Sequence, residues 1–119
     1  MNRLIIIIHS SEIIRKGLAA IIRNFFNIEI LQLEKIGDLN DYRDMKNNAL
    51  LLIIQDLVKI PLEPLHTIRN NNQVKIIAYK INPEIKSTIP YDCEECINNE
   101  TTSITLQEII SKCLKYIQY

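Results

Sequence analysis

An unbroken run of aliphatic residues near the start of the chain constrains the fold more than any other feature. It extends from Leu4 to Ile8 and stops at His9 and Ser10, after which a helical pattern begins. A short, fully apolar run is typical of a strand that is buried on both faces, as in parallel sheets covered by helices. Ligands of such sheets bind just past the carboxyl ends of the strands, so His9 and Ser10 are expected at a working edge.

Two amphipathic helices are predicted, one directly after the first strand and one at the end of the chain. Ser10 or Ser11 can cap the first, and Thr102 or Ser103 the last. The apolar stripe of the first helix consists of Ile14, Leu18, Ile21, Ile22 and Phe25. That of the last helix consists of Leu106, Ile109, Ile110, Cys113 and Ile117. Gly17 costs about 1 kcal/mol of helix propensity relative to Ala, so we expect it to have a packing reason.

The chain between these helices alternates further strands with weaker helical segments. Strands are predicted at residues 27–34, 49–54, 74–79 and 93–97. A weakly amphipathic helix is predicted to begin at Gly37, and a short helix to follow Pro61. The inward residues of that short helix are expected to be Leu62, Leu65 and Ile68. The segment between Pro83 and Pro90 leaves room for only a turn or two, so the fourth helix is predicted to be shortened.

This alternation predicts a single α/β domain over residues 1–119. Right-handed crossovers with helices on both faces give a doubly wound, flavodoxin-like parallel sheet of five strands in the order 2-1-3-4-5. A length of 119 residues suits one domain with its own core.

Composition excludes several classes of partner. Fourteen basic and fourteen acidic residues give a formal net charge of zero, so no overall field attracts nucleic acid or an anionic membrane. The apolar runs are far shorter than the roughly 20 residues of a membrane-spanning helix. Three cysteines without a secretion signal indicate reduced thiols, and we expect a cytoplasmic protein.

Two segments carry a resemblance to a known family. They are Ile13-Ile14-Arg15-Lys16-Gly17-Leu18, shortly after the first strand, and Thr102-Ser103-Ile104-Thr105-Leu106 at the start of the last helix. They resemble bacterial response-regulator receiver domains, of the subclass that precedes a helix-turn-helix DNA-binding domain. The resemblance covers the whole chain and implies the receiver fold, and a signalling domain rather than an enzyme.

The resemblance also implies a set of site positions. In that family an acidic pair after the first strand holds Mg²⁺, and an Asp after the third strand accepts a phosphoryl group. A Ser or Thr after the fourth strand and a Lys after the fifth bind the phosphoryl oxygens. The equivalents here are His9 and Ser10 for the acidic pair, Gln55 or Asp56 for the phosphoacceptor, Lys80 for the hydroxyl residue and Asn99 for the lysine.

These departures predict that the phosphotransfer chemistry has been lost. Mg²⁺ prefers carboxylate oxygens, which His9 and Ser10 do not offer, so no metal or other cofactor is expected. Without the cation and the lysine, even Asp56 would be a poor phosphoacceptor. The prediction is a degenerate receiver domain that acts as a phosphorylation-independent interaction or dimerisation module in signal transduction and transcription control.

Two other functions stay open at this point. One is a conventional receiver phosphorylated on Asp56. The other is a small-ligand or anion-binding protein that uses Ser10 and Ser11 at a helix N-terminus. Asp56 and Lys80 follow neighbouring strands, so they either form an ion pair that imitates one state of a switch or are two solvated charges.

The expected partner is a protein, either another protein or a second copy of the chain. We expect a homodimer through the last helix, with Leu114, Tyr116 and Tyr119 as partly exposed interface residues and the first helix as the opposing surface. DNA contact would need an output domain after Tyr119, and no membrane contact is expected. Cys93 and Cys96 have C-x-x-C spacing, but on a strand such residues point to opposite faces, which argues against a redox or zinc site.

Overall fold

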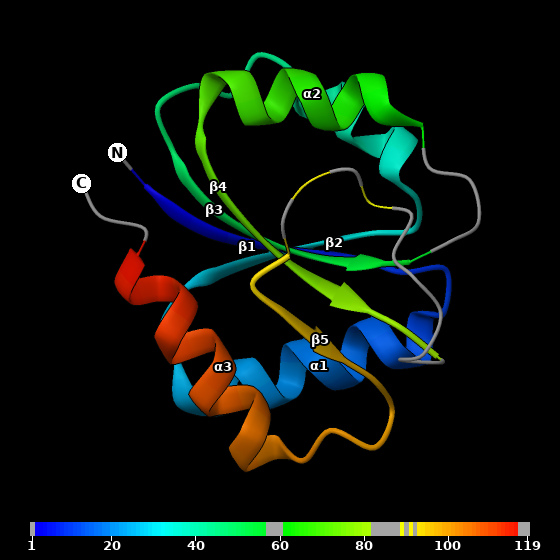
Figure 1. Cartoon of the computed structure of the whole chain (residues 1–119), viewed down its shortest axis with the longest axis vertical. Coiled ribbons are helices and arrows are strands. Elements are labelled where there is room, and N and C mark those ends of the chain that lie inside the picture. Colours follow the sequence, from blue (N-terminus) through cyan, green and yellow to red (C-terminus); the bar gives the residue numbers. More distant parts are fainter. Residues whose placement is uncertain (1, 57–60, 82–88, 90, 92, 117–119) are drawn as a thin grey trace.

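The computed structural model describes residues 2–56, 61–81, 89, 91 and 93–116. Its centre is a five-stranded parallel sheet with the strand order β2-β1-β3-β4-β5 (Figure 1). The strands are β1 (Arg3–Ile8), β2 (Glu29–Leu33), β3 (Ala49–Gln55), β4 (Gln73–Tyr79) and β5 (Glu95–Ile97). The predicted α/β class and strand order are confirmed.

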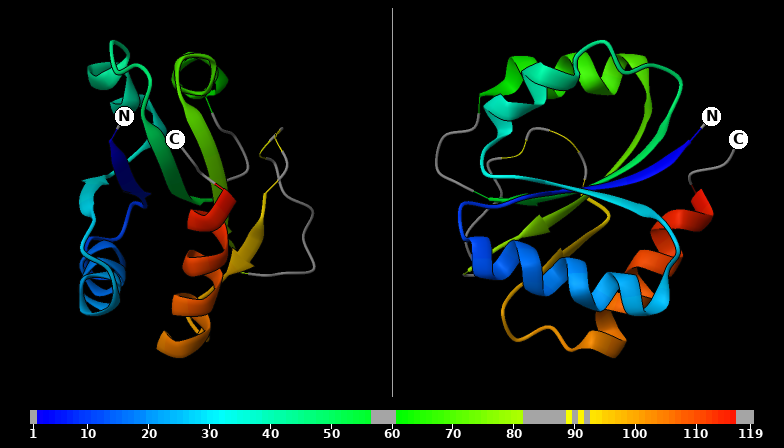
Figure 2. Two further views of the ribbon diagram at one scale, coloured as in Figure 1. Left: turned by 90° about the vertical axis from the view of Figure 1, so that its left-hand side faces the viewer. Right: turned by 180° about the vertical axis from the view of Figure 1, so that it is seen from behind.

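Helical layers cover the two faces of the sheet (Figure 2). The α-helices α1 (Glu12–Phe25) and α3 (Ser103–Tyr116) lie on one face. The 3₁₀ helix η1 (Ile36–Tyr42) and the α-helix α2 (Leu62–Asn71) lie on the other. Each layer forms its own apolar core against the sheet, so a strand inside the sheet must be apolar over the stretch that both layers cover.

Strands β1 and β3 meet that requirement. The side chains from Ile5 to Ile8 and from Leu50 to Ile54 are at most 2% exposed. Successive side chains of a strand point to opposite faces, so alternate residues of each run enter the two cores. Each fully buried Leu or Ile contributes about 1.5–3 kcal/mol, which makes this pair of strands the stable centre of the sheet.

Helix α1 begins as predicted at a serine cap, and Ser11 is the capping residue. Its Oγ accepts a hydrogen bond from the backbone N–H of Ile14 at 3.3 Å. Ile22 is buried, but Phe25 at the end of the predicted stripe is 43% exposed, so its assignment to the core was wrong. The packing reason expected for Gly17 is also wrong, because a Cβ there would meet nothing within 4 Å.

The weakly amphipathic helix predicted to begin at Gly37 is η1, a 3₁₀ helix that begins at Ile36, and not an α-helix. The backbone N–H of Asp38 donates to the Lys35 carbonyl, and the Lys35 N–H donates to the Asp38 carboxylate. Gly, Asp and Asn recur in this segment and have low α-helix propensity, which favours the tighter, shorter form.

The remaining helices follow the predicted pattern with one exception. In α2, Leu65 and Ile68 are buried, but Leu62 is 39% exposed and so is not an inward residue. Helix α3 follows Thr102, whose Oγ1 accepts from the Thr105 backbone N–H at 3.1 Å. Its stripe is buried at Leu106, Ile110 and Cys113 and packs against the core at Ile109.

Two expectations fall outside the described part of the chain. The shortened fourth helix was placed between Pro83 and Pro90, and Ile117 was placed in the last apolar stripe; residues 82–88, 90 and 117–119 are not among those described. Among the described residues, no helix has the length and apolar character needed to cross a membrane.

Candidate functional site

The carboxyl ends of three neighbouring strands bring together five of the predicted site residues. His9 and Ser10 follow β1, Gln55 ends β3 and is followed by Asp56, and Lys80 follows β4. Because β1, β3 and β4 are adjacent and parallel, these positions lie along one edge of the sheet (Figure 1). This is the edge at which parallel α/β sheets bind ligands.

His9 is 4% exposed, and both its backbone and its ring make contacts. Its backbone N–H donates to the carbonyl of Leu33 at 3.1 Å. Its Nδ1 accepts from the backbone N–H of Ser11 at 2.9 Å, and its carbonyl oxygen accepts from Nη1 of Arg15 at 2.6 Å. Its ring meets that of Tyr79 edge to face, with 4.8 Å between the centroids. His9 therefore fixes the β1–α1 loop against β2 and β4.

The hydrogen bonds of His9 also define its protonation. Since Nδ1 accepts a hydrogen bond, the neutral ring carries its proton on Nε2. Burial lowers the pKa of His9, and the nearby Arg15 guanidinium lowers that pKa further. Nε2 is buried and has no hydrogen-bond partner among the residues that the structure describes. The first strand thus ends in a neutral ring, where the resemblance would place a carboxylate.

Ser10 and Gln55 form a direct link between two strand ends. The backbone N–H of Ser10 donates to Oε1 of Gln55 at 2.9 Å. This bond connects the β1–α1 loop to the end of β3 through an uncharged amide. The bond lies at the exposed surface of the strand ends.

Asp56 lies one residue beyond this link and is half-buried. Its backbone N–H donates to the carbonyl of Tyr79 at 2.9 Å, which extends the β3–β4 pairing. Ile8 pairs with Ile54, so Gln55 is level with His9 and Asp56 with Ser10. Both assignments of the phosphoacceptor position stay predictions.

Lys80 is only 8% exposed, and its backbone N–H donates to the Ile97 carbonyl at 2.9 Å. The salt bridges within the described ranges are Lys16–Glu12, Lys75–Glu94 and Lys112–Glu95. The ion pair considered between Asp56 and Lys80 is therefore not formed. Lys80 has low exposure as a whole residue, but its Nζ is not one of the buried side-chain atoms that lack a hydrogen-bond partner, so a solvated ammonium group at this strand end stays a prediction.

Asn99 lies on an exposed turn after β5, two residues beyond Ile97. The turn is closed by neighbouring residues, because the backbone N–H of Asn98 donates to the Thr101 hydroxyl at 3.0 Å. Over the described ranges, no three His, Cys, Asp or Glu side chains are grouped so that they could hold a metal ion. At this edge, uncharged groups join Ser10 to Gln55 and Ser11 to His9, and the Arg15 guanidinium donates to the His9 carbonyl.

Comparison with solved structures identifies the fold of the chain. Neither a protein-family model nor a curated protein matches the sequence. The N-terminal domain of a response regulator/sensory box/GGDEF three-domain protein from Carboxydothermus hydrogenoformans superposes with a TM-score of 0.78 at 11% identity, covering 95% of this chain and 94% of that one. The signal receiver domain of an HD domain-containing protein from Pseudomonas fluorescens gives 0.76 at 12% identity, covering 98% and 97%. This chain has the receiver-domain fold.

A third structure gives a similar match to the fold. A DNA-binding response regulator of the LuxR family from Staphylococcus aureus superposes with a TM-score of 0.68 at 18% identity, covering 95% of this chain and 98% of that chain. These identities are low, so the likeness concerns the fold.

Two residues that hold the strand ends of this receiver fold were not anticipated. Arg15 was named in the sequence only as part of the segment that resembles the family, and it is half-buried and donates to the His9 carbonyl. Its position in the first turn of the helix after β1 is the signal that could have revealed this contact. Tyr79 was predicted only as the end of a strand, and its ring packs against His9.

The predicted interface residues of the last helix have different outcomes. Leu114 is 9% exposed and belongs to the core between the sheet and helices α1 and α3, so its description as partly exposed was wrong. Tyr116 ends α3, and Tyr119 lies outside the described residues. An interface role for the two tyrosines stays a prediction. Of the C-x-x-C cysteines, Cys96 is exposed on β5 and Cys93 precedes the strand.

Proposed function

We propose that this chain is a degenerate receiver domain that acts as a phosphorylation-independent interaction or dimerisation module in bacterial signal transduction and transcription control. The observation that carries the proposal is the 2.9 Å hydrogen bond from Ser10 to Gln55. It joins with uncharged groups the two strand ends where the receiver family holds a cation.

The chemistry of phosphoryl transfer supports the same conclusion. A carboxylate accepts a phosphoryl group only when cations neutralise the crowded negative charge. Here His9 is neutral and buried, and Ser10 presents its backbone N–H to Gln55. Neither residue provides the carboxylate oxygens that Mg²⁺ prefers.

Exposure to a small phosphodonor tests the proposal directly. The chain is incubated with acetyl phosphate and Mg²⁺ and its intact mass is measured, with a phosphorylation-competent receiver as the positive control. We expect no mass gain of one phosphoryl group. A gain that disappears in Asp56→Asn would show a conventional receiver instead.

Mg²⁺ binding can be followed separately from phosphorylation. Amide chemical shifts of Ser10, Asp56 and Lys80 are recorded during a titration with millimolar Mg²⁺. Because the strand ends lack the family's acidic pair, we expect no saturable change. Shifts that saturate at all three residues would contradict the proposal.

A conventional receiver is the second candidate, and Asp56 favours it. Its carboxylate is half-buried just beyond the end of β3, one residue past the closed Ser10–Gln55 link. The two functions differ in the effect of Asp56→Asn on the biological output. A degenerate receiver keeps its output in that variant, whereas a phosphorylated regulator loses it.

A further inference from the structure

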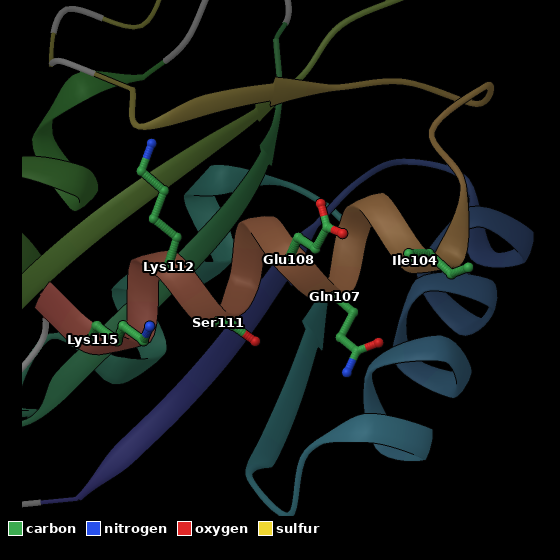
Figure 3. A pocket seen from close by; sticks show the side chains of 6 residues that line it. All are labelled: Ile104, Gln107, Glu108, Ser111, Lys112 and Lys115. Carbon is green, nitrogen blue, oxygen red and sulfur yellow. The ribbon is translucent and has the colours of Figure 1, made fainter.

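Two hollows on the surface of the domain differ in the side chains that line them. The larger, of about 520 Å³, lies along the outer side of α3, and its side chains are polar or charged apart from Ile104. Figure 3 shows these side chains spread around the helix, so they do not converge on a ligand. The smaller, of about 200 Å³, lies at the amino ends of β1 and β2, on the face of the sheet that carries η1. It is lined by Asn2, Leu4, Glu29, Leu31, Tyr42, Met45 and Asn48.

The floor and wall of the smaller hollow, here called the amino-end recess, are apolar. Leu4 of β1 and Leu31 of β2 form its floor and are half-buried. Tyr42 at the end of η1 and Met45 just after it are half-buried as well and form its wall. The seven residues of η1 span roughly 14 Å, whereas the six residues of β1 span roughly 20 Å. The 3₁₀ helix is thus too short to cover the whole apolar face, and the recess remains at the amino ends.

Hydrogen bonds fix the loop that carries the wall of this recess. The side-chain amide of Asn72 accepts from the backbone N–H of Asn48 at 3.0 Å and donates to the carbonyl of Met45 at 3.0 Å. The backbone N–H of Ala49 donates to the carbonyl of Asn2 at 2.8 Å, which ties the loop to the start of β1. The recess is therefore formed before a ligand enters, and binding needs little ordering of the protein.

A carboxylate stands at the rim of the amino-end recess. Of the described residues that line it, Glu29 alone carries a charge, and it is exposed at the start of β2. Glu29 pairs with Leu4 and lies two residues before Leu31, so its side chain is on the same face of the sheet as theirs. A cationic group therefore complements the rim. An aromatic ring suits the wall, because the Tyr42 ring and the Met45 sulfur both make favourable contacts with rings.

We propose that the amino-end recess binds a small aromatic amine, with the ring on the apolar wall and the ammonium group paired with the Glu29 carboxylate. Most ligand pockets measure roughly 300–1,000 Å³. A recess of about 200 Å³ suits a ligand with a single ring rather than a larger cofactor. It lies at the opposite end of the sheet from His9, Ser10 and Gln55, so this binding goes beyond the proposed function and can be tested apart from it.

Titration of the full chain with phenethylamine tests the site. Amide chemical shifts are followed as the amine is raised through the millimolar range, and phenylpropionate, which has the same ring and the opposite charge, is titrated in parallel. We expect saturable shifts at Leu4, Leu31 and Met45 with the amine, and none at Ser10 or Gln55. Binding of phenylpropionate should be about tenfold weaker or absent, since its carboxylate faces that of Glu29.

Two matched variants show whether the charge of Glu29 acts in binding. Glu29→Gln keeps the size of the side chain and removes its charge, so phenethylamine should bind about fivefold more weakly, and no better than the neutral phenethyl alcohol. Glu34→Gln makes the same change at an exposed residue just past the other end of β2, and binding should be unchanged. The amide spectrum of each variant shows whether it is folded.

Three results would overturn the proposal. They are the absence of saturable shifts with phenethylamine, equal affinity for the amine and for phenylpropionate, and unchanged amine binding in Glu29→Gln. The phosphodonor assay probes the carboxyl ends of the strands and does not depend on this site, so failure of the amine site and failure of the proposed function are distinguishable.

Discussion

The two ends of the sheet use the same chemical group in different ways. At the amino ends of β3 and β4, the Asn72 amide accepts from the backbone N–H of Asn48 and donates to the carbonyls of Met45 and Ile68. At the carboxyl ends, the Gln55 amide accepts one hydrogen bond, from Ser10. An amide side chain bridges loops at both ends, but the Asn72 amide makes three hydrogen bonds and the Gln55 amide makes one.

This difference separates the end that stabilises the fold from the end that holds the candidate site. At the amino end, the three hydrogen bonds of Asn72 join two loops, so this end contributes mainly to stability. The carboxyl end combines one amide link with a buried histidine whose pKa is lowered by burial. We therefore expect substitutions at the amino end to affect unfolding most, and those at the carboxyl end to change the response to pH and ions.

The largest effect is expected for Asn72→Ala. It removes three hydrogen bonds of about 1 kcal/mol each, so the free energy of unfolding should fall by about 3 kcal/mol. Urea unfolding measures the change, and Asn70→Ala, at an exposed position near the end of α2, should cost at most about 0.5 kcal/mol. Equal losses in the two variants would remove the distinction between the sheet ends.

The next largest effect is expected to be a pH dependence of the free energy of unfolding that arises from His9. The pKa of folded His9 lies below its ordinary value of 6.5, so the unfolded chain takes up the proton at higher pH than the folded chain. The free energy of unfolding therefore falls as the pH drops below 6.5 and continues to fall until the pH reaches the lowered pKa. Urea unfolding between about pH 5.5 and pH 7.5 measures this slope.

The matched control is His9→Asn. An asparagine oxygen can still accept from the N–H two residues on but does not titrate, so the His9 part of the slope should vanish. The exposed second histidine provides a comparison: in His66→Asn, the contribution of His9 to the slope should persist. A slope that is unchanged in His9→Asn would mean that His9 is not held neutral by its surroundings.

The smallest effect is expected for Gln55→Ala, which removes a single hydrogen bond. The free energy of unfolding should fall by about 0.5–1 kcal/mol. Gln55→Glu keeps an oxygen that can accept from Ser10 and should retain most of the stability at neutral pH. A loss in Gln55→Ala as large as that in Asn72→Ala would show that the carboxyl end is as firmly joined as the amino end.

Much of the fold follows from patterns that the sequence displays openly. The runs of β1 and β3 are apolar at every position because both faces are buried, and short runs of this kind are typical of parallel sheets covered by helices. The exposure of Phe25 and Leu62 could not be predicted in this way, since periodicity places a residue on a face but does not show how far the sheet extends beneath it. Gly17 is similar: its low propensity suggested a packing demand, while the structure leaves open space around it.

The candidate site was predictable in position but not in its contacts. Strand ends are visible in the sequence, so His9, Gln55 and Lys80 could be placed at one edge. The Ser10–Gln55 hydrogen bond joins residues 45 apart, and the sequence contains no signal for which side chain crosses that distance. Leu114 was assigned to a surface because it lies beside the apolar stripe, whereas the core of α3 is wide enough to include it.

The strand order has a consequence for the way the protein is made. β1 is synthesised first and lies between β2 and β3, so the first three strands are all available once residue 55 has left the ribosome. Strands β4 and β5 are then added one after the other to the same growing edge. Until residues 62–71 of α2 emerge, η1 is the only helix among the described residues that shares this core with β3. The apolar face of β3 is then incompletely covered, and the speed of translation across this interval would set how long the nascent chain is prone to association.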